Sequence, residues 1–146
     1  MLTTREVLTS CLSVPRWVDE VLAGQPYDTA RALLAAADRA ARELSDVELD
    51  QALSGHPRIG ERGGAQSQRE QSGVDSGSDT VARLAAGNAA YETRFGRVFL
   101  IRAAGRDADE ILAELERRLD NDDATERAET VDNLRQIALL RLEATL

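Results

Sequence analysis

The chain has 146 residues and carries 18 basic against 26 acidic side chains, for a formal net charge of −8. All of the basic residues are Arg. The chain has no Lys, one His (His56) and one Cys (Cys11). These counts exclude a Schiff-base lysine and a P-loop lysine, as well as a zinc site built from Cys and His. Any chemistry that needs an imidazole must use His56.

Composition and length predict one soluble domain spanning residues 1–146. A single Cys cannot form an internal disulfide, which fits a reducing compartment. Neither a signal peptide nor an apolar run long enough to span a bilayer is evident, so we expect a cytoplasmic protein without a membrane partner. Arg residues alternate with Asp and Glu, which argues against a nucleic-acid partner.

The spacing of apolar residues predicts an all-α fold, a compact multi-helix bundle with one long polar loop. Near-regular i, i+3, i+4, i+7 patterns and turn signals place helices over residues 3–11, 15–23, 28–44, 46–53, 79–94, 107–119 and 124–144. In the 79–94 helix, Val81, Leu84, Ala85 and Tyr91 are expected near one face, with Gly96 as the C-terminal cap. The stretch 97–102, RVFLIR, predicts an extended connector that crosses the core, or the start of a helix.

Helix starts are marked by a capping residue with Glu three positions later. Five such pairs occur: Thr3/Glu6, Ser45/Glu48, Ser67/Glu70, Asp107/Glu110 and Asp123/Glu126. Because the pattern recurs, Glu70 taken alone is read first as a cap. The start of a helix also exposes N–H groups that bind anions, so Glu70 and Gln71 would flank such a site.

The long polar loop, residues 54–78, contains the only His of the chain. Loops of this length are usually functional or disordered. Pro57 disfavours the α region for His56, so the imidazole is expected on a stiff, non-helical corner. His56 is therefore a candidate catalytic residue, and the alternative is an ordinary surface histidine.

Arg141 is expected between Leu134 and Ile137, inside the apolar stripe of the last helix. A guanidinium there is unfavourable unless it has an anionic or carbonyl partner, so we interpret Arg141 as a carboxylate or carbonyl binder. The alternatives are a buried ion pair or a side chain that extends to solvent.

Five strings occur in a familiar order: GHPRIGER at 55–62, SQREQ at 67–71, NAAYETRFG at 88–96, FLIRA at 99–103 and LLRLE at 139–143. Over essentially the whole chain, this order resembles the 2-oxo-4-hydroxy-4-carboxy-5-ureidoimidazoline (OHCU) decarboxylase family. The resemblance implies a compact helical fold, OHCU as the small-molecule substrate and (S)-allantoin as the product in urate degradation. It also implies that neither a metal nor an organic cofactor takes part.

The resemblance further implies that His56 and Glu70 belong to the active site. We hypothesise that His56 is the general acid/base and that Glu70 orients it or polarises the substrate. The implied substrate-binding residues are Pro57, Ser67, Gln68, Arg69, Gln71, Phe99, Leu100, Ile101, Arg102, Ala103 and Arg141. The family often has a small residue or Cys where this chain has Arg102. Family members are often dimers, so a homodimer is an expected assembly, with Trp17 and the first helices as its candidate interface.

Two other functions stay open at this point. A non-catalytic helical module would use the 54–78 loop to bind a partner, and a related decarboxylase or lyase would act on another ureido acid.

Overall fold

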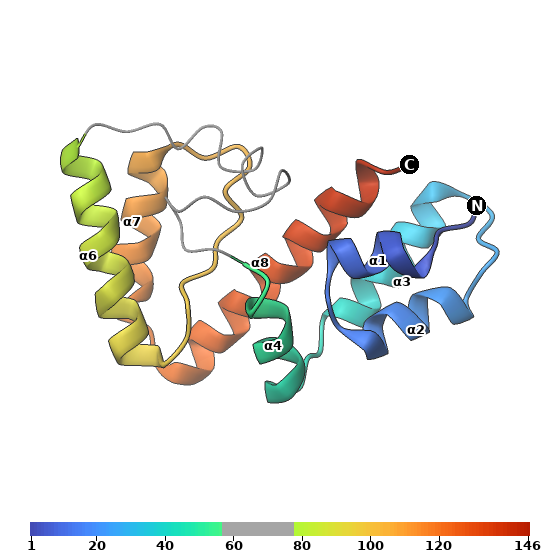
Figure 1. Ribbon diagram of the computed structural model, residues 1–146, viewed down its shortest axis with the longest axis horizontal. Coiled ribbons are helices and arrows are strands. Elements are labelled where there is room, and N and C mark those ends of the chain that lie inside the picture. Colours follow the sequence, from blue (N-terminus) through green and yellow to red (C-terminus); the bar gives the residue numbers. More distant parts are fainter. Residues whose placement is uncertain (57–77) are drawn as a thin grey trace. The chain divides into compact units, whose positions relative to one another are not determined.

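The computed structural model describes residues 1–56 and 78–146, which contain helices and no strand (Figure 1). The helices are α1 (Arg5–Cys11), α2 (Pro15–Ala23), α3 (Ala30–Ala41), α4 (Asp46–Leu53), α6 (Ser78–Phe95), α7 (Ala108–Arg118) and α8 (Asp123–Glu143). The prediction of an all-α fold is confirmed. Among the helices described, none is long and apolar enough to cross a membrane.

The described residues form two units, Met1–Gly55 with Val131–Leu146, and His56–Thr130. The single-domain organisation stays a prediction.

Two of the predicted capping pairs are confirmed, at the starts of α4 and α7. Ser45 and Glu48 form a reciprocal capping box at α4, with bonds of 3.2 and 2.9 Å between each side chain and the other residue's N–H. Asp107 caps α7 by accepting the N–H of Glu110 at 2.8 Å. At α1 the expectation is one residue early, because the hydroxyl of Thr4 rather than Thr3 accepts a helix N–H. The Ser67/Glu70 pair lies outside the described residues.

The expected cap at the start of α8 is wrong. Asp122, not Asp123, accepts the N–H of Thr125 at 2.7 Å. Glu126 does not reach back to the helix start, because its carboxylate is fully buried against the guanidinium of Arg118 at 3.0 Å. A buried cation is a stronger partner for a carboxylate than a backbone N–H at a solvated helix end.

The core of the first unit includes Trp17, whose side chain is fully buried. Its indole N–H donates to the carbonyl oxygen of Ala37 at 2.9 Å, which ties α2 to α3. Also buried in this unit are Leu8, Cys11, Val14, Val18, Leu33, Leu134, Ile137, Ala138 and Leu142. The suggestion that Trp17 supplies a dimer interface is therefore wrong, since it has no exposed surface to offer.

In the second unit, α6 and α7 lie side by side (Figure 1). Their close approach depends on Gly87, because a Cβ there would lie 2.5 Å from Cδ2 of Leu115. The buried stripe of α6 runs through Leu84, Asn88 and Tyr91, at i, i+4 and i+7. The expectation that Val81 shares this face is wrong, and so is the same expectation for Ala85. Ala85 is exposed because it lies off that spacing, whereas Val81 continues the spacing toward the start of the helix and is nevertheless 52% exposed.

After α6 the chain runs without helix or strand through Arg97–Ala103. Gly96 ends α6 at φ +73°, with its N–H bonded to the carbonyl oxygen of Glu92 at 2.9 Å, which confirms the predicted cap. Phe99, Leu100, Ile101 and Ala103 are all buried, three of them in the core cluster with Ile111 and Leu115. The prediction of an extended connector crossing the core is confirmed, and the alternative of a helix start is wrong.

Candidate active site

The segment Phe99–Ala103, here called the connector, is the part of the predicted site that the structure describes most fully. Phe99, Ile101 and Ala103 belong to the core cluster of the second unit, Leu100 is also buried, and Arg102 is partly exposed. Arg106 closes the end of the connector, because its Nε donates to the carbonyl oxygen of Arg102 at 2.9 Å and its N–H to that of Ala103 at 3.1 Å. The connector is thus a packed, hydrogen-bonded segment outside regular secondary structure.

A buried arginine holds the middle of the connector. Arg118, in the last turn of α7, donates from Nη1 to the carbonyl oxygen of Leu100 at 2.8 Å. Its guanidinium carbon lies 4.6 Å from the centre of the Phe99 ring, in cation–π geometry. The Arg118 side chain is only 1% exposed, so this contact is shielded from water.

The other edge of the same guanidinium binds Glu126. Nε of Arg118 lies 3.0 Å from each carboxylate oxygen, and Nη2 lies 2.5 Å from one of them. The hydroxyl of Tyr91 and the amide of Asn121 also donate to this carboxylate. We call Arg118, Glu126, Tyr91 and Asn121 the buried network. Each charge in it has a partner of opposite sign, as burial of a charge requires.

Tyr91 connects the buried network to the connector a second time. Its ring meets the Phe99 ring edge-on, with 5.2 Å between centres. Burial raises the pKa of Tyr91 to about 12, and the hydrogen bond to Glu126 adds to the rise, so its hydroxyl stays a donor at neutral pH. The connector is therefore held by a polar bond to its backbone and an aromatic contact to its side chain.

Sequence reasoning missed Arg118 and Glu126, although a signal for Arg118 was present. Arg118 follows Ile111 by seven residues and Leu115 by three, so it lies on the apolar face of its helix. This is the same anomaly that singled out Arg141. Glu126 was hidden because its position also suits a helix cap.

His56 lies outside helix, three residues after the end of α4 at Leu53, and is partly exposed. This agrees with the expected non-helical corner. The remaining predicted residues of the polar loop lie outside the described residues: Pro57, Ser67, Gln68, Arg69, Glu70 and Gln71.

Arg141 belongs to the first unit, where Leu134, Ile137 and Ala138 form the buried stripe expected of α8. Arg141 is itself partly exposed, and its Nη1 approaches the carbonyl oxygen of Ser10 at 3.4 Å. Its guanidinium thus contacts a backbone carbonyl, one of the partner types expected for it. A role in substrate binding stays a prediction.

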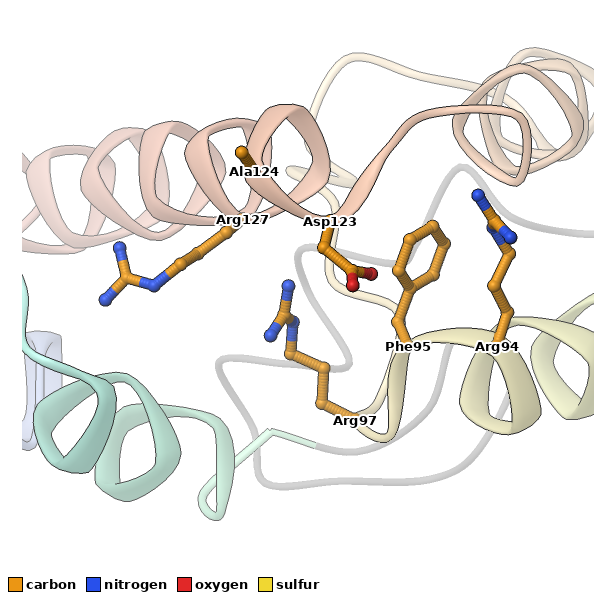
Figure 2. A pocket seen from close by; sticks show the side chains of 6 residues that line it. All are labelled: Arg94, Phe95, Arg97, Asp123, Ala124 and Arg127. Atoms are coloured by element: carbon orange, nitrogen blue, oxygen red, sulfur yellow. The ribbon is translucent and has the colours of Figure 1, made fainter.

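A separate pocket of about 360 Å³ lies in the second unit, where α6 ends and α8 begins (Figure 2). Its lining residues are Arg94, Phe95, Arg97, Asp123, Ala124 and Arg127. Three guanidiniums against one carboxylate make this lining positive, and it contains none of the predicted site residues. Across the described part of the chain, no cluster of three or more His, Cys, Asp or Glu residues is placed to hold a metal ion.

The order of motifs and the helical fold agree with comparisons to known proteins. The model of the OHCU decarboxylase family matches residues 3–143. The chain belongs to the OHCU decarboxylase family. It is 32% identical over 135 residues to the 2-oxo-4-hydroxy-4-carboxy-5-ureidoimidazoline decarboxylase of Haloferax volcanii, covering 86% of this chain and 79% of that one. It is also 41% identical over 81 residues to a putative enzyme of the same name from Homo sapiens, covering 53% and 47% of the two chains.

Two solved structures share the fold. A crystal structure of OHCU decarboxylase in the presence of (S)-allantoin matches with a TM-score of 0.84 over 98% of both chains, at 22% identity. A crystal structure of (S)-allantoin synthase matches with a TM-score of 0.73 over 97% of this chain and 49% of that one, at 18% identity. At these identities the likeness establishes the helical architecture and no more.

Proposed function

We propose that this protein is a decarboxylase that converts OHCU to (S)-allantoin in urate degradation, with His56 as its general acid/base. The observation that carries the proposal is the family match over residues 3–143. The related sequence from Haloferax volcanii, which aligns with 86% of this chain, supports it further. The proposal extends to a cytoplasmic enzyme that needs no cofactor.

The chemistry suits a chain with one His and no Lys. OHCU carries a carboxylate and a hydroxyl on the same ring carbon, next to a C=N bond. When the bond to the carboxylate breaks, CO₂ leaves, the electron pair flows into the C=N bond, and the nitrogen takes a proton. The substrate is its own electron sink, so no Schiff base is required.

The protein must then manage protons and orientation. The hydroxyl loses its proton as the carbonyl forms, and the carbon that bears the ureido arm gains a proton on one face. We assign these transfers to His56, with Glu70 orienting it or polarising the substrate. Arg141, the connector backbone and the N–H groups near Ser67–Gln71 would hold the oxygen-bearing groups of the ring and ureido arm.

The decisive experiment generates OHCU in situ from 5-hydroxyisourate with its hydrolase and follows absorbance and circular dichroism after this protein is added. We expect accelerated formation of a single enantiomer of allantoin. Racemic product at the uncatalysed rate would refute the proposal and favour a non-catalytic interaction module. A panel of other ureido acids tests whether a different substrate is preferred.

Substitution of His56 tests the mechanism within this assay. General acid–base catalysis typically contributes about 10²–10⁴-fold, so His56→Ala should lose at least that much in kcat. His56→Gln keeps a polar side chain but cannot carry the proton, so it should be equally impaired. Near-full activity in either variant, with an unchanged far-ultraviolet spectrum, would refute the role of His56.

A further inference from the structure

The guanidinium of Arg118 has two edges with different partners. Nε and Nη2 face the carboxylate of Glu126, whereas Nη1 faces the backbone of the connector at Leu100. A cation required only to neutralise Glu126 would not need the second edge. The planar fork therefore fixes the connector relative to the buried carboxylate.

We propose that Arg118 is a positioning residue for the decarboxylation, because it fixes the backbone of the connector against which the substrate binds. This inference rests on the proposed function, which places Phe99–Ala103 in the substrate site. Arg118 acts through the connector, since its own side chain is 1% exposed and packed behind the Phe99 ring.

The rest of the buried network keeps Arg118 in place. Glu126 is itself held by donors from three elements, because Tyr91 lies on α6, Asn121 precedes α8 and Arg118 lies on α7. Thr130, one turn after Glu126, accepts a further bond from Nη2 of Arg118 at 3.3 Å. With these partners the guanidinium has little freedom to turn, so the carbonyl oxygen of Leu100 has a fixed donor.

The geometry suggests a substitution that removes the bond to the connector and keeps the charge beside Glu126. Lysine has a single ammonium nitrogen, which cannot occupy the positions of Nη1 and of Nε with Nη2 together. Arg118→Lys therefore keeps a cation beside Glu126 but releases the connector. Arg117→Lys is the matched control. Arg117 is the preceding residue of α7 and also binds two carboxylates, Glu114 and Glu129. Within the described residues, its hydrogen bonds go to these carboxylates and not to the connector.

The test compares the two lysine variants by steady-state kinetics and by hydrogen exchange of the amides of Leu100–Ala103. A displacement of about 1 Å in a site can lower the rate about 10²-fold, so we expect kcat/KM of Arg118→Lys to fall about 10- to 100-fold. We also expect KM to rise and exchange in the connector to quicken. Arg117→Lys should stay within about twofold of the wild type, because an exposed ion pair contributes little.

The KM readout separates positioning from a merely structural role. Loss of folded enzyme lowers kcat and leaves KM unchanged, whereas a displaced connector changes the affinity of the molecules that remain folded. If Arg118→Lys fails to fold, the neutral pair Arg118→Met/Glu126→Gln takes its place, because it removes the donor to Leu100 without leaving a buried charge alone. The same rise in KM is expected of that variant.

Two results would overturn the inference. Unchanged exchange at Leu100–Ala103 in the folded variant would show that Arg118 does not fix the connector. Faster exchange with an unchanged KM and kcat/KM would show that the connector does not position the substrate. An inactive wild-type protein would instead refute the proposed function, and the exchange measurement would still decide whether Arg118 orders the connector.

Discussion

The buried ion pair between Arg118 and Glu126 makes a quantitative prediction about stability. Their side chains are 1% and 0% exposed, and Nη2 of Arg118 lies 2.5 Å from the carboxylate. Removing one partner of such a pair leaves a charge buried and uncompensated, which typically costs about 3–5 kcal/mol. We therefore expect Arg118→Met and Glu126→Gln each to lower the free energy of unfolding by about that amount.

The double variant should lose much less free energy of unfolding than the sum of the losses of the two single variants. If the single losses were additive, Arg118→Met/Glu126→Gln would lose about 6–10 kcal/mol. Because the double variant buries no charge, we expect it to lose no more than either single variant, about 3–5 kcal/mol. The resulting coupling energy is about 3 kcal/mol or more, at the upper end for contacting residues.

Urea unfolding followed by far-ultraviolet circular dichroism measures this cycle. The control is the parallel cycle on Arg117 and Glu129, which lie 2.6 Å apart but are 49% and 29% exposed. Water and salt screen that pair, so its coupling should stay below about 1 kcal/mol. Additive losses in the Arg118 and Glu126 cycle would contradict the reasoning, and so would equal coupling in the two cycles.

Three further predictions follow from other contacts. Gly87→Ala should lower the melting temperature, because the added methyl would lie 2.5 Å from Cδ2 of Leu115. Such overpacking costs about 1–3 kcal/mol, which exceeds the gain in helix propensity from Gly to Ala. A stabilised variant would contradict the close approach of α6 and α7. In urea titrations above pH 10, the wild type should lose stability and Tyr91→Phe should lose less. The reason is that the pKa of Tyr91 is raised to about 12 in the folded state, so the unfolded state gives up the proton first as the pH rises. An equal decrease of the free energy of unfolding with pH in the two proteins would contradict this reasoning. Arg141→Ala should raise KM in the allantoin assay with a smaller loss of kcat, whereas an unchanged KM would mark Arg141 as purely structural.

Much of the fold could be predicted from sequence because its signals are local. The helices over 15–23 and 46–53 were placed at their observed bounds, since Pro15 starts one and the Ser45/Glu48 capping box starts the other. The non-helical stretch 97–102, which overlaps the connector, is predictable because it is largely apolar, too short for a sheet and preceded by a glycine cap. In each case neighbours within four residues determine the conformation.

The wrong predictions arise where a residue distant in the sequence determines the burial or the bonding of a side chain. Glu126 has the spacing of a cap, but Arg118, eight residues earlier, draws its carboxylate into the core. Val81 has the helical spacing of Leu84, yet it is exposed, whereas Leu84 is buried in the core cluster with residues of α7. Likewise, the candidate site residues came from the order of motifs, which identifies them without giving their geometry. Only contacts between elements could reveal that the connector is bonded to Arg118.

Cys11 gives the first unit a built-in chemical probe. The thiol is 1% exposed, and burial raises its pKa, although the hydrogen bond from Ser10 and the charge of Arg141 oppose the rise. The thiolate is the species that attacks disulfide reagents, so the folded protein should react with them only when the helices around Cys11 separate. As the only sulfhydryl in the chain, it would record that opening at a single site. The residue before it, Ser10, is the one whose carbonyl oxygen Arg141 contacts. The rate of labelling would therefore report how often the backbone beside Arg141 opens, in a protein otherwise unchanged.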